Sequence, residues 1–106
     1  MPYTGGPMTE AMYYVLLALL NPAHGYRLMQ AVDEVSGGRV PMGPGTLYGV
    51  LNRMQGDGLI SLATDDGRRK IYRITRNGHD ALRAEYARLR DMVRDGAVIE
   101  GVGANG

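Results

Sequence analysis

The order of residues between Gly45 and Lys70 constrains the fold of this chain more than any other feature. Four apolar residues mark one helical face: Leu47, Val50, Leu51 and Met54. Gly56 and Gly58 end that segment, and two short alternating segments follow, joined by a turn that contains Gly67. The sequence therefore predicts a helix followed directly by a two-stranded hairpin whose tip is Arg68-Arg69-Lys70.

A helix before this pair completes a recognisable unit. It is expected at Gly25–Val35 with an inward stripe of Leu28, Met29, Val32 and Val35, and residues 37–45 form a Gly- and Pro-rich connection to a third helix that starts near Pro44. A helix fits the major groove of a duplex, and a basic hairpin reaches phosphates beside it. The predicted fold class is mostly α with a two-stranded β wing, a winged helix-turn-helix plus a C-terminal dimerisation helix.

The first helix is apolar on two faces. Thr9 is its expected N-cap, and it runs to about Leu20, with Pro22 beyond it. Met8, Met12, Val15 and Leu19 form one seam, and Tyr13, Leu16, Leu17 and Leu20 form another. A helix that is apolar all round must be buried on more than one side, and a chain of 106 residues has few other elements to cover both. We expect one seam to pack within the chain and the other to meet a second subunit.

The wing strands are expected at Leu59–Thr64 and Lys70–Thr75, with Ile60, Leu62, Tyr72 and Ile74 directed inward. Thr75 then caps a last helix from about Asn77 to Arg94. Its seam is Leu82, Tyr86, Leu89 and Val93. Two heptads are too short to pair stably alone, so this helix is expected to extend a dimer formed by the first helix.

The expected organisation has four parts: an N-terminal arm (1–8), a winged helix-turn-helix DNA-binding domain (9–76), a C-terminal dimerisation helix (77–95) and a flexible Gly-rich tail (96–106). The net charge of +1 is uninformative, but the positive charge is local. Residues 68–76 hold five basic side chains and no acid. A solvated hairpin tip is the alternative, and the helix that precedes the tip favours a nucleic-acid contact.

Several function classes lack support in the sequence. Cysteine is absent, and His24 and His79 are far apart, so neither disulfides nor a zinc cluster is expected. No acid–base, metal or P-loop signature is recognisable, so we predict neither enzyme activity nor a cofactor. The longest apolar run, Ala11–Leu20, is about half of the ~20 residues that span a membrane, and residues 1–9 lack a signal-peptide pattern. We expect a cytoplasmic protein.

Short motifs occur in a fixed order: Gly25-Tyr26 with Leu28, Gly45-Thr46-Leu47-Tyr48 with Leu51 and Arg53, Gly58-Leu59-Ile60, and Gly67-Arg68-Arg69-Lys70 with Tyr72, Ile74-Thr75 and Gly78. Over about residues 9–95 this set resembles the PadR family of bacterial transcriptional regulators, in its compact type with a single C-terminal helix. The resemblance implies a winged-helix DNA-binding domain, a dimer built from the first and last helices, and a repressor released by a small aromatic or drug-like effector.

Two positions depart from the family pattern. Gly43 stands where the family often has Ser, so the third helix start offers no hydroxyl to a phosphate. Ala63 and Thr64 occupy a region where the family often has Trp, and the chain has no Trp with which to stack a planar ligand. The resemblance therefore implies DNA binding more strongly than effector binding.

The candidate DNA-contacting residues are Tyr26, Thr46, Tyr48, Asn52, Arg53, Arg68, Arg69 and Lys70. Hydroxyls of Thr46 and Tyr48 can donate to phosphate, Asn52 can bond to adenine, and Arg53 to guanine or phosphate. The alternatives are core positions for Tyr26 and Tyr48, and ordinary solvation for Asn52 and Arg53.

The candidates for a dimer interface or effector pocket are Met8, Met12, Tyr13, Val15, Leu16, Leu19, Leu82, Tyr86, Leu89 and Val93. Adaptable Met and Tyr side chains suit flat apolar ligands. Plain interface core is the alternative and the favoured interpretation.

Together these patterns predict a sequence-specific DNA-binding transcriptional regulator, a ligand-responsive homodimeric repressor. Its expected partners are a pseudo-palindromic duplex, a second copy of the chain and a small aromatic effector, with no membrane. Two alternatives stay open: a winged-helix protein–protein interaction module whose charge serves solubility, and a small-molecule sensor with weak DNA binding.

Overall fold

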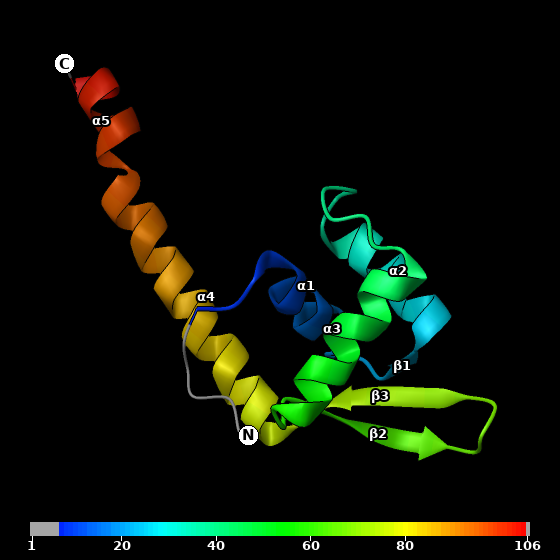
Figure 1. Ribbon diagram of the computed structural model, residues 1–106. Helices are drawn as coiled ribbons and strands as arrows, with labels where there is room; N and C mark the ends of the chain where they lie inside the picture. Colours follow the sequence, from blue (N-terminus) through cyan, green and yellow to red (C-terminus); the bar gives the residue numbers. More distant parts are fainter. Residues whose placement is uncertain (1–6, 106) are drawn as a thin grey trace.

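The computed structural model describes residues 7–105, so residues 1–6 of the expected N-terminal arm lie outside the described part of the chain. The elements are α1 (Glu10–Ala18), β1 (Ala23–His24), α2 (Gly25–Val35), α3 (Pro44–Gly56), β2 (Ile60–Asp65), β3 (Lys70–Ile74), α4 (Arg76–Gly96) and α5 (Val98–Asn105). Figure 1 shows α1, α2 and α3 gathered beside the β2–β3 hairpin, with α4 rising away from them. The predicted fold class is confirmed, and β1 adds a third strand to the sheet.

Helix α1 is enclosed, because α2, α3 and α4 all contact it. Thr9 caps it as predicted, and its Oγ1 accepts a hydrogen bond from the Met12 N–H at 3.1 Å. Leu16 is fully buried within the chain. Three helices surround α1, and of the seam that contains Leu16 only Leu20 is exposed.

The core is continuous from α1 to the wing. Its fully buried side chains are Val15, Leu16, Leu19, Leu28, Val32, Leu47, Leu51, Met54 and Leu59, with Ile60 almost so. Burying one such side chain stabilises a fold by roughly 1.5–3 kcal/mol relative to exposure. Val35 was predicted to point inward but is 46% exposed, because it is the last residue of α2, where the chain turns away.

The connection from α2 to α3 begins with two glycines in left-handed conformation, Gly37 at φ 63° and Gly38 at φ 80°. Arg39 then ties this connection to α1. Its Nη2 donates to the Tyr14 hydroxyl at 2.7 Å and to Glu10 Oε2 at 3.3 Å. The connection is thereby held against α1. At the start of α3, Gly43 is the N-cap and makes no side-chain hydrogen bond.

The sheet is antiparallel in the order β1-β3-β2. Strand β1 was not predicted, because two residues carry no alternating pattern. It pairs Ala23 with Tyr72 and His24 with Ile71. Strands β2 and β3 pair from Ile60 with Ile74 out to Asp65 with Lys70, with a register shift between Leu62 and Thr64. The pairing of β1 places the N-terminal end of α2 against the hairpin.

Thr75 joins the exit of α3 to the start of α4. Its Oγ1 donates to the Gly58 carbonyl oxygen at 2.7 Å and accepts from the Gly78 N–H at 3.0 Å, so the predicted N-cap is confirmed. A β-carbon at Gly78 would overlap the Leu59 carbonyl oxygen and lie 2.9 Å from Ile74 Cγ1. The backbones of α4 and the wing therefore meet at the closest approach that glycine allows.

Glu85 of α4 holds Met8 against that helix through a hydrogen bond to the Met8 backbone. The Glu85 side chain is 5% exposed, and its carboxylate accepts from the Met8 N–H at 3.3 Å and from Arg88 Nε and Nη2 at 2.9 and 2.6 Å. The hydrogen bonds from Arg88, and to a smaller extent the one from Met8, hold the pKa of the Glu85 carboxyl below its usual range despite burial. This carboxylate is therefore ionised and paired in the fold.

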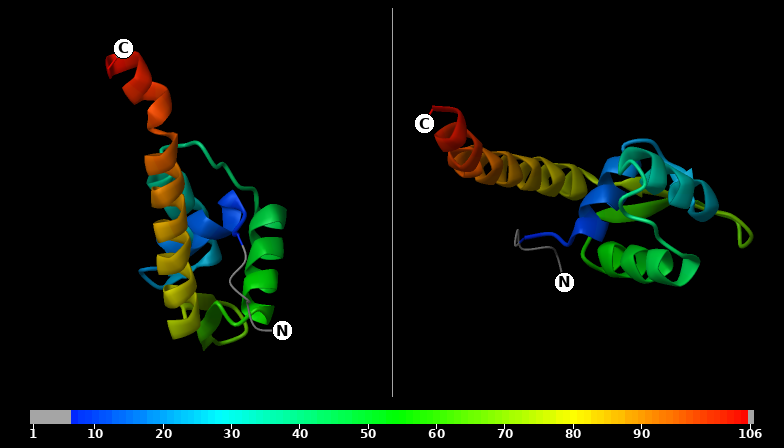
Figure 2. Two further views of the ribbon diagram at one scale, coloured as in Figure 1. Left: turned by 90° about the vertical axis from the view of Figure 1, so that its left-hand side faces the viewer. Right: turned by 90° about the horizontal axis from the view of Figure 1, so that it is seen from above.

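Helix α4 extends for 21 residues out of the core, and α5 continues beyond it (Figures 1 and 2). The molecule is accordingly elongated, measuring 61 × 28 × 20 Å. Residues 96–106 were predicted as a flexible tail, but Val98–Asn105 form α5. The prediction weighed glycine content alone, whereas helix α4 sits immediately before this segment, and an existing helical turn removes most of the cost of nucleation.

Candidate nucleic-acid interface

The wing, the start of α2 and one side chain of α3 enclose a cleft of about 370 Å³. Its lining residues are His24, Gly25, Tyr26, Tyr48, Gly67, Arg68, Arg69 and Lys70. Three of them are cationic and none carries a carboxylate. The cleft is therefore complementary to an anion. It brings together five of the residues predicted to contact DNA, from three segments far apart in the sequence.

Tyr48 reaches from α3 to the first residue of α2. A β-carbon at Gly25 would overlap the Tyr48 hydroxyl and lie 2.8 Å from Tyr48 Cζ, so only glycine makes room for the ring as it stands. Tyr48 is 43% exposed, which excludes the alternative of a core aromatic. Burial, and after it the neighbouring Tyr48, raises the pKa of the Tyr72 phenol. Tyr48 thus forms a wall of the cleft, with its hydroxyl against Gly25.

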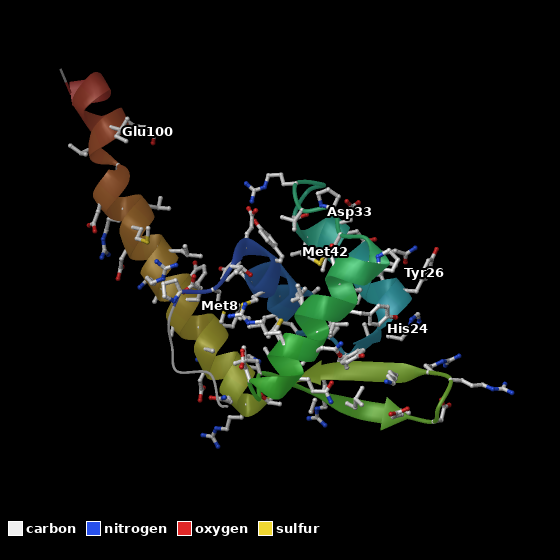
Figure 3. The ribbon with its side chains drawn as sticks, viewed as in Figure 1. Met8, His24, Tyr26, Asp33, Met42 and Glu100 are labelled. Carbon is white, nitrogen blue, oxygen red and sulfur yellow. The ribbon has the colours of Figure 1, made fainter. Side chains whose placement is uncertain are left out.

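Tyr26 and His24 lie together at the end of α2 that faces the hairpin (Figure 3). Tyr26 is 66% exposed, so it too is a surface residue rather than a core one. His24 caps α2, with its Nδ1 accepting from the Arg27 N–H at 3.4 Å. Sequence reasoning considered His24 only in excluding a zinc site. Its place in the cleft depends on the β1–β3 pairing, for which the sequence carried no signal.

Two aspartates shape the wing tip. Asp65 Oδ1 accepts from the Gly67 N–H at 3.1 Å, and Asp66 Oδ1 accepts from the N–H groups of Arg68 and Arg69 at 3.0 and 2.7 Å. The bond from Arg69, followed by that from Arg68, holds the pKa of the Asp66 carboxyl below its usual range. Gly67 has φ 86°, which favours glycine. The carboxylates bond to the backbone of the turn, and the basic side chains of the tip are exposed.

The outer face of α3 carries the other candidates. Thr46, Asn52 and Arg53 are exposed and lie outside the lining of the cleft. Tyr48 and Asn52 are four residues apart and therefore share a face. Arg53 Nε is 3.9 Å from Asp57 Oδ2, a surface pair that leaves the Arg53 side chain 69% exposed. All four side chains are available to an external partner.

Two further residues of α3 were not identified from the sequence as part of this surface. Gly45 and Gly49 are exposed, and a β-carbon at either would meet nothing within 4 Å. They are four residues apart and share a face. Without side chains at these positions, another molecule can approach the backbone of α3 closely.

The residues predicted for a dimer interface or effector pocket divide into two groups. Met8, Met12, Val15, Leu16, Leu19 and Leu82 are buried in the core of the chain itself. Of these six, Met8 and Leu82 also line grooves beside α4. Tyr13 and Leu89 are half-buried, while Tyr86 and Val93 are 56% and 73% exposed. The most exposed of these candidates thus lie on α4.

Two grooves border α4 where it passes α1. One, of about 240 Å³, is lined mainly by apolar residues: Tyr13, Leu17, Leu20, His79, Leu82, Arg83 and Tyr86. The other, of about 310 Å³, is lined by Met8, Thr9, Glu10, Tyr13, Tyr14, Arg39, Glu85, Arg88 and Leu89. In the second groove both arginines are engaged by carboxylates, Arg39 by Glu10 and Arg88 by Glu85.

The donors gathered in the cleft are guanidinium, ammonium, phenol and imidazole groups, which suit phosphate oxygens. Within residues 7–105, no group of three or more metal-ligating side chains is placed to hold an ion. No helix in that part of the chain is long and apolar enough to cross a membrane.

Two relatives resemble this chain in sequence. The chain is 37% identical over 97 residues to an uncharacterized 37.1 kDa protein in transposon TN4556 of Streptomyces fradiae, covering 88% of this chain but only 28% of that relative. It is 37% identical over 78 residues to the transcriptional regulator Rv3488 of Mycobacterium tuberculosis, covering 71% of this chain and 70% of the relative. The chain thus spans most of one relative and a small part of the other.

The fold is similar to the crystal structure of a PadR family transcriptional regulator from Eggerthella lenta, with 29% identity and a TM-score of 0.68 over 82% of this chain and 74% of that one. Residues 15–84 match the transcriptional regulator PadR-like family, and this range contains every residue that lines the cleft. The chain belongs to the PadR-like family of transcriptional regulators.

Proposed function

We propose that the protein is a homodimeric, sequence-specific DNA-binding repressor that responds to a small ligand. The observation that carries the proposal is the cationic cleft, in which the wing tip and the start of α2 converge beside the exposed face of α3. Family membership supports DNA binding as the role of this surface.

In the proposed complex α3 enters the major groove. Asn52 and Arg53 are exposed there and can reach base edges, while Thr46 and Tyr48 donate to phosphates. Arg68, Arg69 and Lys70 of the wing bind the adjacent backbone. The bare backbone at Gly45 and Gly49 allows α3 to sit deep in the groove.

Apolar residues on the distal helices support a dimer. Tyr86, Met92 and Val93 of α4 and Val98 and Ile99 of α5 are all more than half exposed. Tyr86 and Val93 are seven residues apart, as are Met92 and Ile99, which is the spacing of a helix-pairing seam. Exposed apolar stripes of this kind mark interaction surfaces. We propose that residues 77–95 pair with a second copy, while residues 9–76 form the DNA-binding unit.

A dimer of this form would place two α3 helices in successive major grooves of a pseudo-palindromic operator, about 10 base pairs apart or a multiple of that. Occupation of promoter DNA would repress transcription sterically. The apolar groove beside Tyr13 and Tyr86 suits a small aromatic effector. Such a ligand would induce transcription only by binding differently to dimers of different spacing.

Fluorescence anisotropy tests the proposal directly. The full chain is titrated into labelled duplex from its own upstream region, with scrambled duplex as competitor, at several salt concentrations. Preference for the upstream duplex by orders of magnitude, with a steep salt slope, is the expected result. Binding that ignores both sequence and salt would refute the proposal and favour a protein-interaction module.

A further inference from the structure

His24 is held at both its backbone and its ring. The backbone lies in β1, paired with Ile71 of β3, and the ring caps α2 by accepting the Arg27 N–H at Nδ1. A ring nitrogen that accepts a hydrogen bond carries no proton, so the neutral imidazole has its N–H at Nε2. The cap therefore fixes the tautomer and leaves Nε2–H as a donor on the other side of the ring.

No acceptor in the described part of the chain bonds to that donor. Among residues 7–105, the hydrogen bond with Arg27 is the only one that the His24 ring makes. The ring is half-buried and lines the cleft with Arg68, Arg69 and Lys70, all of which are donors too. Nε2–H is therefore available to a bound anion or to water.

We infer that His24 is a phosphate-binding residue, whose Nε2–H donates to a phosphate oxygen seated between α2 and the wing while Nδ1 keeps the helix cap. The inference rests on the proposed DNA-binding function and adds to it a contact that the motifs of the chain did not indicate. A neutral donor contributes a hydrogen bond without a positive charge. It should strengthen binding to every sequence and leave the salt slope unchanged, unlike the wing arginines.

Two amide substitutions separate the two roles of the ring. In His24→Asn the amide oxygen lies near the place of Nδ1 and keeps the cap, but nothing reaches the position of Nε2. In His24→Gln the amide nitrogen reaches that position, but the cap is weakened. We expect His24→Asn to weaken duplex binding by roughly threefold to tenfold, the range for one hydrogen bond, with an unchanged salt slope. We expect His24→Gln to bind within about twofold of the wild type and to melt a few degrees lower.

Asn77→Ala is the control, since it removes a neutral polar side chain that is exposed at the start of α4 and lies outside the cleft and both grooves. It should bind duplex as the wild type does. Equal binding by His24→Asn and the wild type would overturn the inference while leaving the proposed function intact. Equal weakening of duplex binding in both His24 variants would also overturn the inference. A salt slope that is lower by one unit in His24→Asn would overturn it as well.

Nitrogen-15 NMR of the His24 imidazole provides a test that does not require sequence-specific binding. The wild-type protein is titrated separately with inorganic phosphate and with duplex. A shift of the Nε2 signal with duplex alone would show that the site between α2 and the wing binds the DNA backbone. A shift with both duplex and inorganic phosphate would show that it binds phosphate groups in general. Either result supports the inference. No shift with either, or a ring protonated at Nδ1, overturns it. If the wild type binds no duplex, the proposed function fails, and the inorganic phosphate titration still decides the role of His24.

Discussion

The hydroxyl of Tyr48 lies over Gly25, in the space that a β-carbon at residue 25 would occupy. The two residues belong to α3 and α2, so this contact sets how the exposed face of α3 meets the cleft. The atom in conflict is the far end of a mobile side chain rather than backbone. An added methyl group would therefore be accommodated by movement of Tyr48, which would alter the shape of the cleft.

We predict that Gly25→Ala will leave stability within about 1 kcal/mol of the wild type, because alanine favours helix and Tyr48 can rotate outward. Duplex affinity should fall at least severalfold, since the Tyr48 wall is displaced. Melting curves and anisotropy together measure this split. Gly56→Ala is the control, as a β-carbon there meets open space. Unchanged affinity in Gly25→Ala would show that the position of Tyr48 is immaterial to binding.

Gly78→Ala, in contrast to Gly25→Ala, should lower the stability of the fold. Its β-carbon would overlap the backbone carbonyl oxygen of Leu59, which no rotamer change relieves. We expect a loss of about 1–3 kcal/mol in the free energy of unfolding, as for other overpacked sites. Urea denaturation measures it, with Gly96→Ala, in open space at the end of α4, as the control. A stability equal to that of the wild type would contradict the close packing of α4 on the wing.

Replacing both Arg68 and Arg69 with Ala should weaken binding to all duplex sequences and reduce the salt slope by about one unit for each phosphate that the variant no longer neutralises. Both side chains are exposed at the wing tip and line the cleft. Anisotropy over a range of salt concentrations measures the slope. The double variant Arg90→Ala with Arg94→Ala makes the same charge change on α4 and should leave the slope as it is. An unaltered salt slope in the wing variant would show that Arg68 and Arg69 do not contact phosphates.

Glu85→Gln tests the ionised carboxylate. The folded-state pKa of Glu85 is lowered from its ordinary value of 4.5, so its stabilising contribution is fully present above that value and is lost as the pH falls through the lower folded-state pKa. The variant should be less stable than the wild type near neutral pH, and the difference should shrink in acid. Urea denaturation across this range reveals it. Glu100→Gln, which removes an exposed carboxylate on α5, is the control variant.

Local signals allowed much of the fold to be predicted from the sequence. The predicted bounds of α2 match the observed ones, and Thr9 and Thr75 were correctly predicted as N-caps. Both signals are local, because a capping side chain and the apolar stripe after it act within a few residues. The wing tip was predicted from its glycine and its run of basic residues, which are local in the same sense.

The features that were missed depend on contacts between distant segments. Burial of Leu16 requires three helices around α1, and the two residues of β1 become a strand only by pairing with β3. The role of Gly25 depends on where Tyr48 lies, twenty-three positions along the chain. In the candidate site, the residue types were therefore predictable, whereas the cleft that unites them, and the place of His24 in it, were not.

The hydroxyl of Thr75 bonds both to the exit of α3 and to the first turn of α4, so it links the two helices directly. With 21 residues, α4 is a lever arm of about 30 Å. A tilt of about 10° at its base moves its far end by roughly 5 Å, a displacement comparable to a full turn of helix. In a dimer built on α4, the separation of the two α3 helices would thus respond to small angular changes at a joint that lies outside the cleft.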